Sequence, residues 1–183
     1  MRALYLFLAG CWTATSAPIP PTPVGPAPIG PPAGATVVTV DAMDAGDPAL
    51  ANEQPIEAAP PWESIRTGRT DSGEIVLVLE HTGKHYTTSI GAGNTLVTGA
   101  FVADVLPGGP RELVLQVDHN NDGGKSVDIV VCGIGASGVP SCGTADVAGV
   151  MDLNEQVEVK AVRSGGVRVV HDGKTHVLWF EFP

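Results

Sequence analysis

Apolar and polar residues alternate with a period of two along much of the second half of the chain. The alternation is clearest in residues 112–118, 127–131, 156–160 and 178–182. A period of two is typical of β-strands that turn one face to an apolar core. Residues 75–79 (IVLVL) are continuously apolar instead, which indicates a central strand covered on both faces.

Turn-forming residues separate these stretches. They are Thr82-Gly83, residues 121–124 (NDGG), residues 164–166 (SGG) and Asp172-Gly173, and such residues favour tight turns between strands. No stretch shows a convincing helical stripe. The pattern predicts an all-β fold, an antiparallel β-sandwich or a small barrel of about seven or eight short strands.

The first third of the chain has a different composition. Twelve of the 16 prolines fall between residues 12 and 61, and this region holds five acidic residues but no Lys or Arg. Proline removes backbone donors and fixes φ, so we expect a disordered or extended Pro-rich tether. The predicted division is an N-terminal signal at 1–10, a tether at 11–61 and a β-domain at 62–183. Residues 37–40 (VVTV) are also compatible with a short strand that docks on the domain.

The overall charge narrows the classes of function. The chain has 20 acidic and 10 basic residues, a net charge of −10, so it lacks the excess of Lys and Arg with which proteins neutralise nucleic-acid phosphates. We therefore expect no nucleic-acid partner. No apolar stretch reaches the roughly 18 to 20 residues that a membrane-spanning helix needs.

The N-terminus has the features of an export signal. Arg2 precedes a short apolar run, and the run ends in Leu8-Ala9-Gly10-Cys11, an order typical of secretory signals. This segment resembles the signal of bacterial lipoproteins, whose lipobox reads Leu-Ala-Gly-Cys. The resemblance implies that Cys11 is lipidated, becomes the new N-terminus and anchors the protein to a membrane. Trp12, where an inner-membrane retention signal has Asp, favours the outer membrane, at its periplasmic face or at the cell surface.

The three cysteines fit this interpretation. If Cys11 carries lipid, Cys132 and Cys142 are left to pair with each other. Nine residues rich in Gly and Ser lie between them, and an exported protein meets an oxidising compartment. The sequence therefore predicts a Cys132–Cys142 disulfide that closes a small loop; two independent buried thiols are the alternative.

One loop resembles part of a calcium site. Residues 118–123 (DHNNDG) match the first half of a D-x-[DN]-x-[DN]-G loop, in which alternate oxygen ligands converge on the ion. The twelfth position is Ile129, where an EF-hand has a bidentate Glu. A plain polar hairpin loop is the simpler interpretation. If calcium binds, the candidate ligands are Asp118, Asn120, Asp122 and Asp128.

Residues 103–115 resemble one repeat of the FG-GAP/VCBS type, in which an acidic turn precedes a strand. Asp104, Gly109 and Glu112 fit that pattern, whereas residues 106–108 (LPG) replace ligand positions of its turn. The resemblance covers one loop and implies no fold.

Sequence motifs for catalysis are absent from the chain. It has no G-x-S-x-G and no H-E-x-x-H. The sequence therefore predicts a lipid-anchored bacterial envelope protein with a non-catalytic binding or structural β-domain. Its expected partners are the membrane, through the lipid, and an envelope protein or a glycan. The alternatives are a calcium-stabilised adhesion or carbohydrate-binding module and, third, a small secreted hydrolase.

Overall fold

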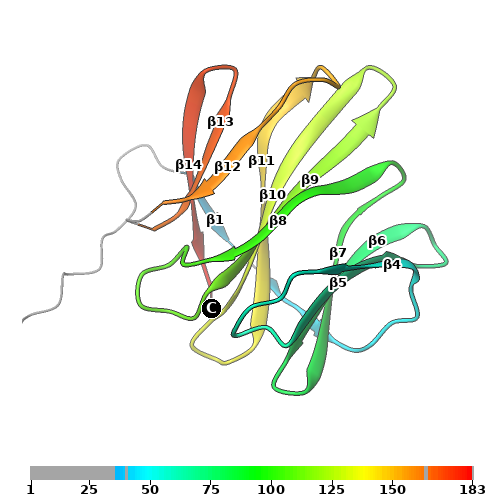
Figure 1. The fold of residues 1–183 in the computed structure, drawn as a ribbon, viewed down its shortest axis with the longest axis vertical. Helices are drawn as coiled ribbons and strands as arrows, with labels where there is room; N and C mark the ends of the chain where they lie inside the picture. Colours follow the sequence, from blue (N-terminus) through cyan, green and yellow to red (C-terminus); the bar gives the residue numbers. More distant parts are fainter. Residues whose placement is uncertain (1–35, 40, 163–164, 183) are drawn as a thin grey trace, which may run out of the picture.

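The computed structural model describes residues 36–39, 41–162 and 165–182. The all-β prediction is confirmed, because every element in this part of the chain is a strand. The strands form three open sheets and no closed barrel (Figure 1). Within these residues no helix is long and apolar enough to cross a membrane.

Sheet I has four strands, and the central sheet II and the outer sheet III have five each. Sheet I runs in the order β1 (Thr36–Thr39), β14 (Lys174–Glu181), β13 (Val167–His171) and β12 (Glu158–Ala161). Sheet II runs β2 (Asp41–Ala42), β11 (Pro140–Met151), β10 (Gly124–Ile134), β9 (Glu112–Asn121) and β8 (Thr95–Ala103). Sheet III runs β3 (Asp44–Ala45), β7 (Lys84–Ala92), β6 (Glu74–His81), β5 (Ser64–Arg69) and β4 (Ala51–Ile56).

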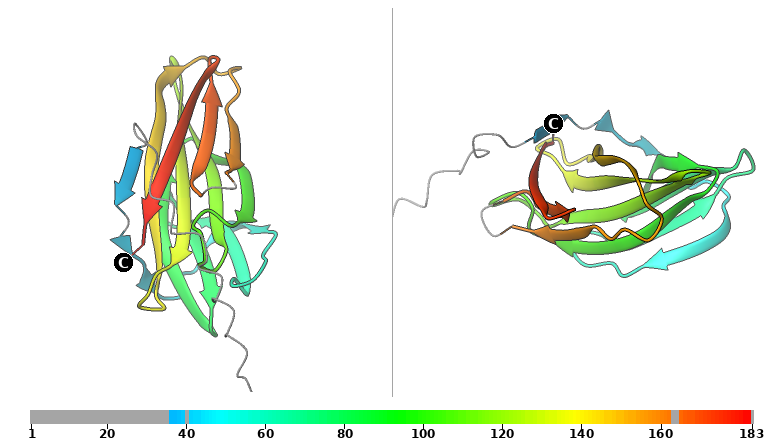
Figure 2. Two further views of the ribbon diagram at one scale, coloured as in Figure 1. Left: turned by 90° about the vertical axis from the view of Figure 1, so that its left-hand side faces the viewer. Right: turned by 90° about the horizontal axis from the view of Figure 1, so that it is seen from above.

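The pairing is antiparallel throughout these sheets except between β1 and β14, which are parallel. The described part of residues 62–183 contains ten strands, β5 to β14, where the sequence predicts about seven or eight. Figure 2 shows β1 (blue) beside β14 (red) at one edge of the molecule.

Sheet II is the middle layer, and its two faces belong to two separate cores. One core joins sheets I and II through residues such as Val114, Ile129 and Phe180. The other joins sheets II and III through residues such as Leu77 and Leu115. Successive strand residues point to opposite faces, so β9 and β10 contribute side chains to both cores. This explains why residues between the predicted apolar positions of β9 are buried as well.

Two hairpin turns follow directly from their sequences. Thr82-Gly83 joins β6 to β7, and Asp172-Gly173 joins β13 to β14. All four residues have positive φ, between 48° and 68°, which is the type I′ geometry that matches the twist of the paired strands. These turns were predicted, and the structure confirms them.

The tether predicted at residues 11–61 is wrong at its C-terminal end. Strands β2, β3 and β4 lie within residues 41–56 and pair with β11, β7 and β5. The apolar–polar pattern does not reveal these strands, because their side chains are mostly exposed and many are small or acidic. Pairing of their backbones with neighbouring strands holds them in place. The short strand considered at 37–40 is present as β1, at Thr36–Thr39. Residues 11–35 of the predicted tether, Val40 and the signal at 1–10 lie outside the described residues.

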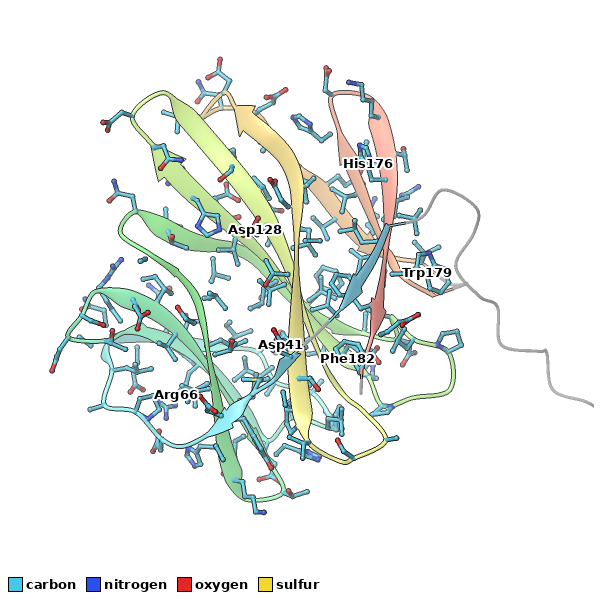
Figure 3. The ribbon with its side chains drawn as sticks, turned by 180° about the vertical axis from the view of Figure 1, so that it is seen from behind. Asp41, Arg66, Asp128, His176, Trp179 and Phe182 are labelled. Carbon is cyan, nitrogen blue, oxygen red and sulfur yellow. A yellow bond between two sulfur atoms is a disulfide. The ribbon has the colours of Figure 1, made fainter. Side chains whose placement is uncertain are left out.

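Residues 46–50 cross the outer face of sheet III, from β3 at one edge to β4 at the other; we call this segment the strap. The Asp47 carboxylate pairs with Arg66 on β5 and lies 3.3 Å from Nδ1 of His85 on β7. A β-carbon built on Gly68 would lie 2.7 Å from Cβ of Leu50. Figure 3 labels Arg66 beside this segment. The strap is therefore held by an ion pair and by close packing against a glycine.

Candidate functional site

Asp118, the first predicted calcium ligand, is already saturated by protein groups. It lies on β9 with 5% of its surface exposed. Its Oδ2 accepts a hydrogen bond from Lys125 Nζ at 2.8 Å, and its Oδ1 accepts from Thr98 Oγ1 at 2.8 Å and from Gln116 Nε2 at 3.1 Å. Burial by itself raises the Asp118 pKa, but these hydrogen bonds and the Lys125 charge outweigh it and hold the pKa below its ordinary value. The Lys125 ammonium group therefore occupies the position beside Asp118 that a metal ion would need.

Asp128, the last predicted ligand, faces the other side of sheet II. It is paired across the ladder with Val117, whose side chain belongs to the core between sheets II and III. Its Oδ2 lies 3.0 Å from His119 Nε2, and His119 Nδ1 lies 3.0 Å from Thr95 Oγ1. The Thr95 hydroxyl also donates to the Ala92 carbonyl, at 2.7 Å. Figure 3 labels Asp128 on the central sheet.

The four predicted calcium ligands are thus not brought together. Asp118 and Asn120 share one face of β9, Asp128 lies on the opposite face of the sheet, and Asp122 is exposed at the β9–β10 turn. In the part of the chain that the structure describes, no three His, Cys, Asp or Glu side chains are placed to hold a metal ion. The sequence spacing placed these residues in one loop, but successive residues of β9 face opposite sides of the sheet, so the ladder separates them. Calcium binding at this loop stays a prediction.

The two predicted disulfide cysteines are directly opposite each other on β10 and β11. Cys132 and Cys142 are bonded, with Cα atoms 4.1 Å apart. Cys132 belongs to the core between sheets II and III, and Met43 Sδ lies 3.2 Å from Cys142 Sγ. The disulfide therefore fastens β11 to β10 within sheet II. Cys11, the predicted lipidation site, lies outside the described residues.

Glu112, which carried the FG-GAP/VCBS resemblance, has a role inside the protein. Its side chain is buried, and Oε2 accepts hydrogen bonds from the backbone N–H groups of Val105 at 2.7 Å and Leu106 at 3.3 Å. Burial raises the pKa of this carboxyl, and the backbone hydrogen bonds offset only part of the rise. Asp104 is exposed, 4.0 Å from Arg111. Glu112 therefore fixes the loop that precedes β9.

A groove runs along β8, the edge strand of sheet II, opposite the β4–β5 edge of sheet III; we call it the seam groove. It consists of three hollows of about 380, 160 and 320 Å³ that share lining residues. The first two share Arg69, Thr95 and Leu96. The second and third share Gln54, Thr67 and Val97. The shared residues make the hollows one depression along β8 from Thr95 to Ala100.

Most of the seam groove is lined by uncharged residues, Asn, Gln, Thr, Gly and small aliphatic side chains. Its two charged residues are Arg69 near Thr95 and Glu57 near Ala100. Arg69 donates to the carbonyls of Gly73 at 2.7 Å and Gly93 at 2.9 Å. Within the described residues no carboxylate lies within ion-pair distance of it. Sequence reasoning missed this groove, since its two walls are about 40 residues apart in the chain.

A fourth hollow of about 450 Å³ continues the groove at its Arg69 end. It is lined by residues 92–95 and 119–122 and shares Gly93, Asn94 and Asn120 with the neighbouring hollow. His119 contributes to its wall, but both ring nitrogens of His119 are engaged by Thr95 and Asp128. Apart from the exposed carboxylate of Asp122, this end offers mainly amide and hydroxyl groups for hydrogen bonding.

The chain was compared with known proteins at three levels. No protein-family model, no curated protein and no solved structure matches it.

Proposed function

We propose that this protein is a lipid-anchored bacterial envelope protein whose β-domain is a non-catalytic binding module. The observation that carries the binding role is the seam groove, an open depression along an edge strand with hydrogen-bonding but mostly uncharged walls. The histidine beside it is held in internal hydrogen bonds. A surface whose walls are mostly amide, hydroxyl and aliphatic groups suits recognition by shape and hydrogen bonds.

The anchor rests on the sequence Leu8-Ala9-Gly10-Cys11 and is supported by the disulfide. A Cys132–Cys142 bond is typical of proteins that fold in an oxidising compartment. Lipid on Cys11 would hold the protein at the outer membrane, at its periplasmic face or at the cell surface, because several acyl chains at about 0.8 kcal/mol per buried methylene give stable attachment. Residues 12–35, between anchor and domain, are rich in Pro and would act as a spacer.

Between the two partner classes, an envelope protein fits the groove better than a glycan. Sugar sites usually rely on aromatic side chains as apolar platforms with polar groups around them. None of the residues that line the seam groove is aromatic. Its amides and its open strand edge instead match the hydrogen-bonding pattern of a polypeptide.

The anchor is tested by Cys11→Ser in a bacterial host. We expect the unchanged chain in the membrane fraction and the Cys11→Ser chain in the soluble fraction or still carrying its signal. Identical fractionation of the two chains would contradict the anchor.

The binding role is tested by photo-crosslinking in intact cells. A crosslinking residue at Ala100, which lines the groove and is exposed, should give a defined product with an envelope component. The same residue at Thr175, exposed on sheet I, is the matched control. Equal products from both positions, or none, would contradict a binding role for the groove.

A further inference from the structure

The seam groove borders an unpaired strand edge. In the described part of the chain β8 pairs only with β9, and β4 only with β5. The free side of an edge strand presents a row of backbone N–H and C=O groups, which is a template for a further strand. Leu96 on β8 is 55% exposed, so an apolar side chain is available beside this edge.

The length of the groove sets the size of the ligand. It follows β8 from Thr95 to Ala100, six residues, or about 20 Å at roughly 3.4 Å per residue. A register shift between Val97 and Gly99 places a bulge in the middle of this run. A strand added here would therefore pair in two short stretches, and a segment of about seven residues is enough to span the groove.

The two charged residues that line the three hollows of the seam groove give it a direction; Asp122 lies beyond them, in the fourth hollow. Arg69, which has no carboxylate partner in the described chain, lies at the Thr95 end, and the exposed Glu57 lies at the Ala100 end. A ligand that matches both has a negative group near Thr95 and a positive group near Ala100. If the positive group comes first in its sequence, the ligand runs antiparallel to β8, which is the slightly more stable mode of strand pairing.

We propose that the seam groove binds an extended polypeptide segment of about seven residues, basic at its first residue, acidic at its last and uncharged between, as an added strand antiparallel to β8. This inference rests on the proposed binding role of the domain and specifies its ligand. The segment belongs to a protein partner and not to a second copy of this chain. Two chains of net charge −10 repel each other, and the bulge in β8 opposes flat edge-to-edge pairing of copies.

The test is calorimetric titration of the full-length chain with blocked seven-residue peptides of Thr, Val and Ser. The forward peptide has Lys first and Glu last, the swapped peptide has Glu first and Lys last, and a third peptide has Pro at alternate positions. We expect the forward peptide to bind at least about tenfold more tightly than the swapped peptide. The Pro peptide should not bind, because proline lacks the backbone donor that a strand uses.

Two variants locate the binding. Glu57→Lys, a change at an exposed side chain, should remove or reverse the preference between forward and swapped peptides. Ala100→Trp should block the groove and reduce affinity at least about tenfold, whereas Thr175→Trp on sheet I should bind like the unchanged chain. Melting curves check that each variant is folded. If Ala100→Trp does not fold, Glu57→Lys still decides the test.

Several outcomes would overturn the proposal. They are no binding of the forward peptide at millimolar concentration, equal binding of the Pro peptide, or a preference that Glu57→Lys leaves unchanged. If the peptide does not bind, but the chain self-associates and Ala100→Trp abolishes this self-association, the groove binds a second copy of the chain instead. The titrations use purified protein and so do not depend on the membrane anchor. If the peptide does not bind but the Cys11→Ser and Ala100 crosslinking experiments succeed, only the proposed ligand is rejected.

If the peptide binds but the chain is not attached to the membrane, only the proposed anchor is rejected.

Discussion

Asp118 and Glu112 are two buried carboxylates on the same strand whose neighbours move their pKa values in opposite directions. Asp118 receives hydrogen bonds from three side chains, among them the cation Lys125, and its pKa is lowered. Glu112 accepts its hydrogen bonds from backbone N–H groups, and burial raises its pKa. Neither residue is free to bind a ligand. Each instead makes the stability of the fold depend on pH.

Loss of the Lys125 charge should be costly. Lys125→Met leaves the Asp118 carboxylate buried without its cation, and breaking a buried pair in this way typically costs about 3–5 kcal/mol. Urea unfolding measures the change. Lys174→Met, at the exposed β13–β14 turn, is the control and should change stability by less than about 0.5 kcal/mol. Equal effects of the two substitutions would show that the Asp118–Lys125 pair is not structurally important.

The two carboxyls should respond to pH with opposite signs. Because the folded pKa of Asp118 is lowered from 3.8, its contribution is present above that value and is lost as pH falls through the folded pKa. Because the folded pKa of Glu112 is raised from 4.5, its contribution is present below that value and is lost as pH rises through the folded pKa. Glu112→Gln should therefore gain stability relative to the unchanged chain as pH rises above 4.5. Thermal melts over a pH series test this, and a constant difference between the two chains would contradict it.

At the scale of elements, the strap and the disulfide hold segments that the hydrophobic core does not. The strap crosses sheet III on the Arg66–Asp47 pair and on the contact of Leu50 with Gly68. The Asp47 side of the ion pair is exposed to solvent, and such pairs contribute at most about 1 kcal/mol. Close packing at Gly68 is therefore the stronger constraint on this segment.

Gly68→Ala should displace the strap. Its β-carbon would lie 2.7 Å from Leu50 Cβ, closer than real β-carbons approach, and overpacking of this kind costs about 1–3 kcal/mol. Hydrogen exchange should speed up in residues 46–50. Gly99→Ala is the matched control, because its β-carbon would lie at an ordinary 3.5 Å from Gln116 Cβ. A Gly68→Ala chain as stable as Gly99→Ala would refute the packing argument.

Removal of the disulfide should weaken the whole domain. Cys132 and Cys142 are 10 positions apart in the chain, and the entropy of closing so short a loop corresponds to about 2–3 kcal/mol. The double variant Cys132→Ala with Cys142→Ala should lose about that much in urea unfolding. Unchanged stability in the double variant would mean that the bond adds nothing to the β10–β11 pairing.

At the scale of the whole molecule, the sequence predicts those features that depend on neighbours along the chain. The I′ turn at Asp172-Gly173 and the presence of strands β9 and β10 are local signals, and the structure confirms them. Burial of both faces of β9 and β10 is not visible in their alternation. Strands β2 to β4 were missed because backbone pairing, and not an apolar stripe, holds them. Their spacing in the sequence suggested that Asp118 and Asp128 bind one ion together, but the strand pairing places their side chains on opposite faces of sheet II. The seam groove arises only when two distant edges meet.

The measurement that tests the central claim most directly is the intact mass of the native protein from a membrane fraction, with and without reduction before alkylation. We expect a chain that begins at Cys11, is heavier by its acyl groups and gains two alkyl groups only after reduction. That result would establish the anchor and show the Cys132–Cys142 bond in the native protein. A chain that still carries Met1 and alkylates at three thiols without reduction would contradict export, lipid anchoring and the disulfide together.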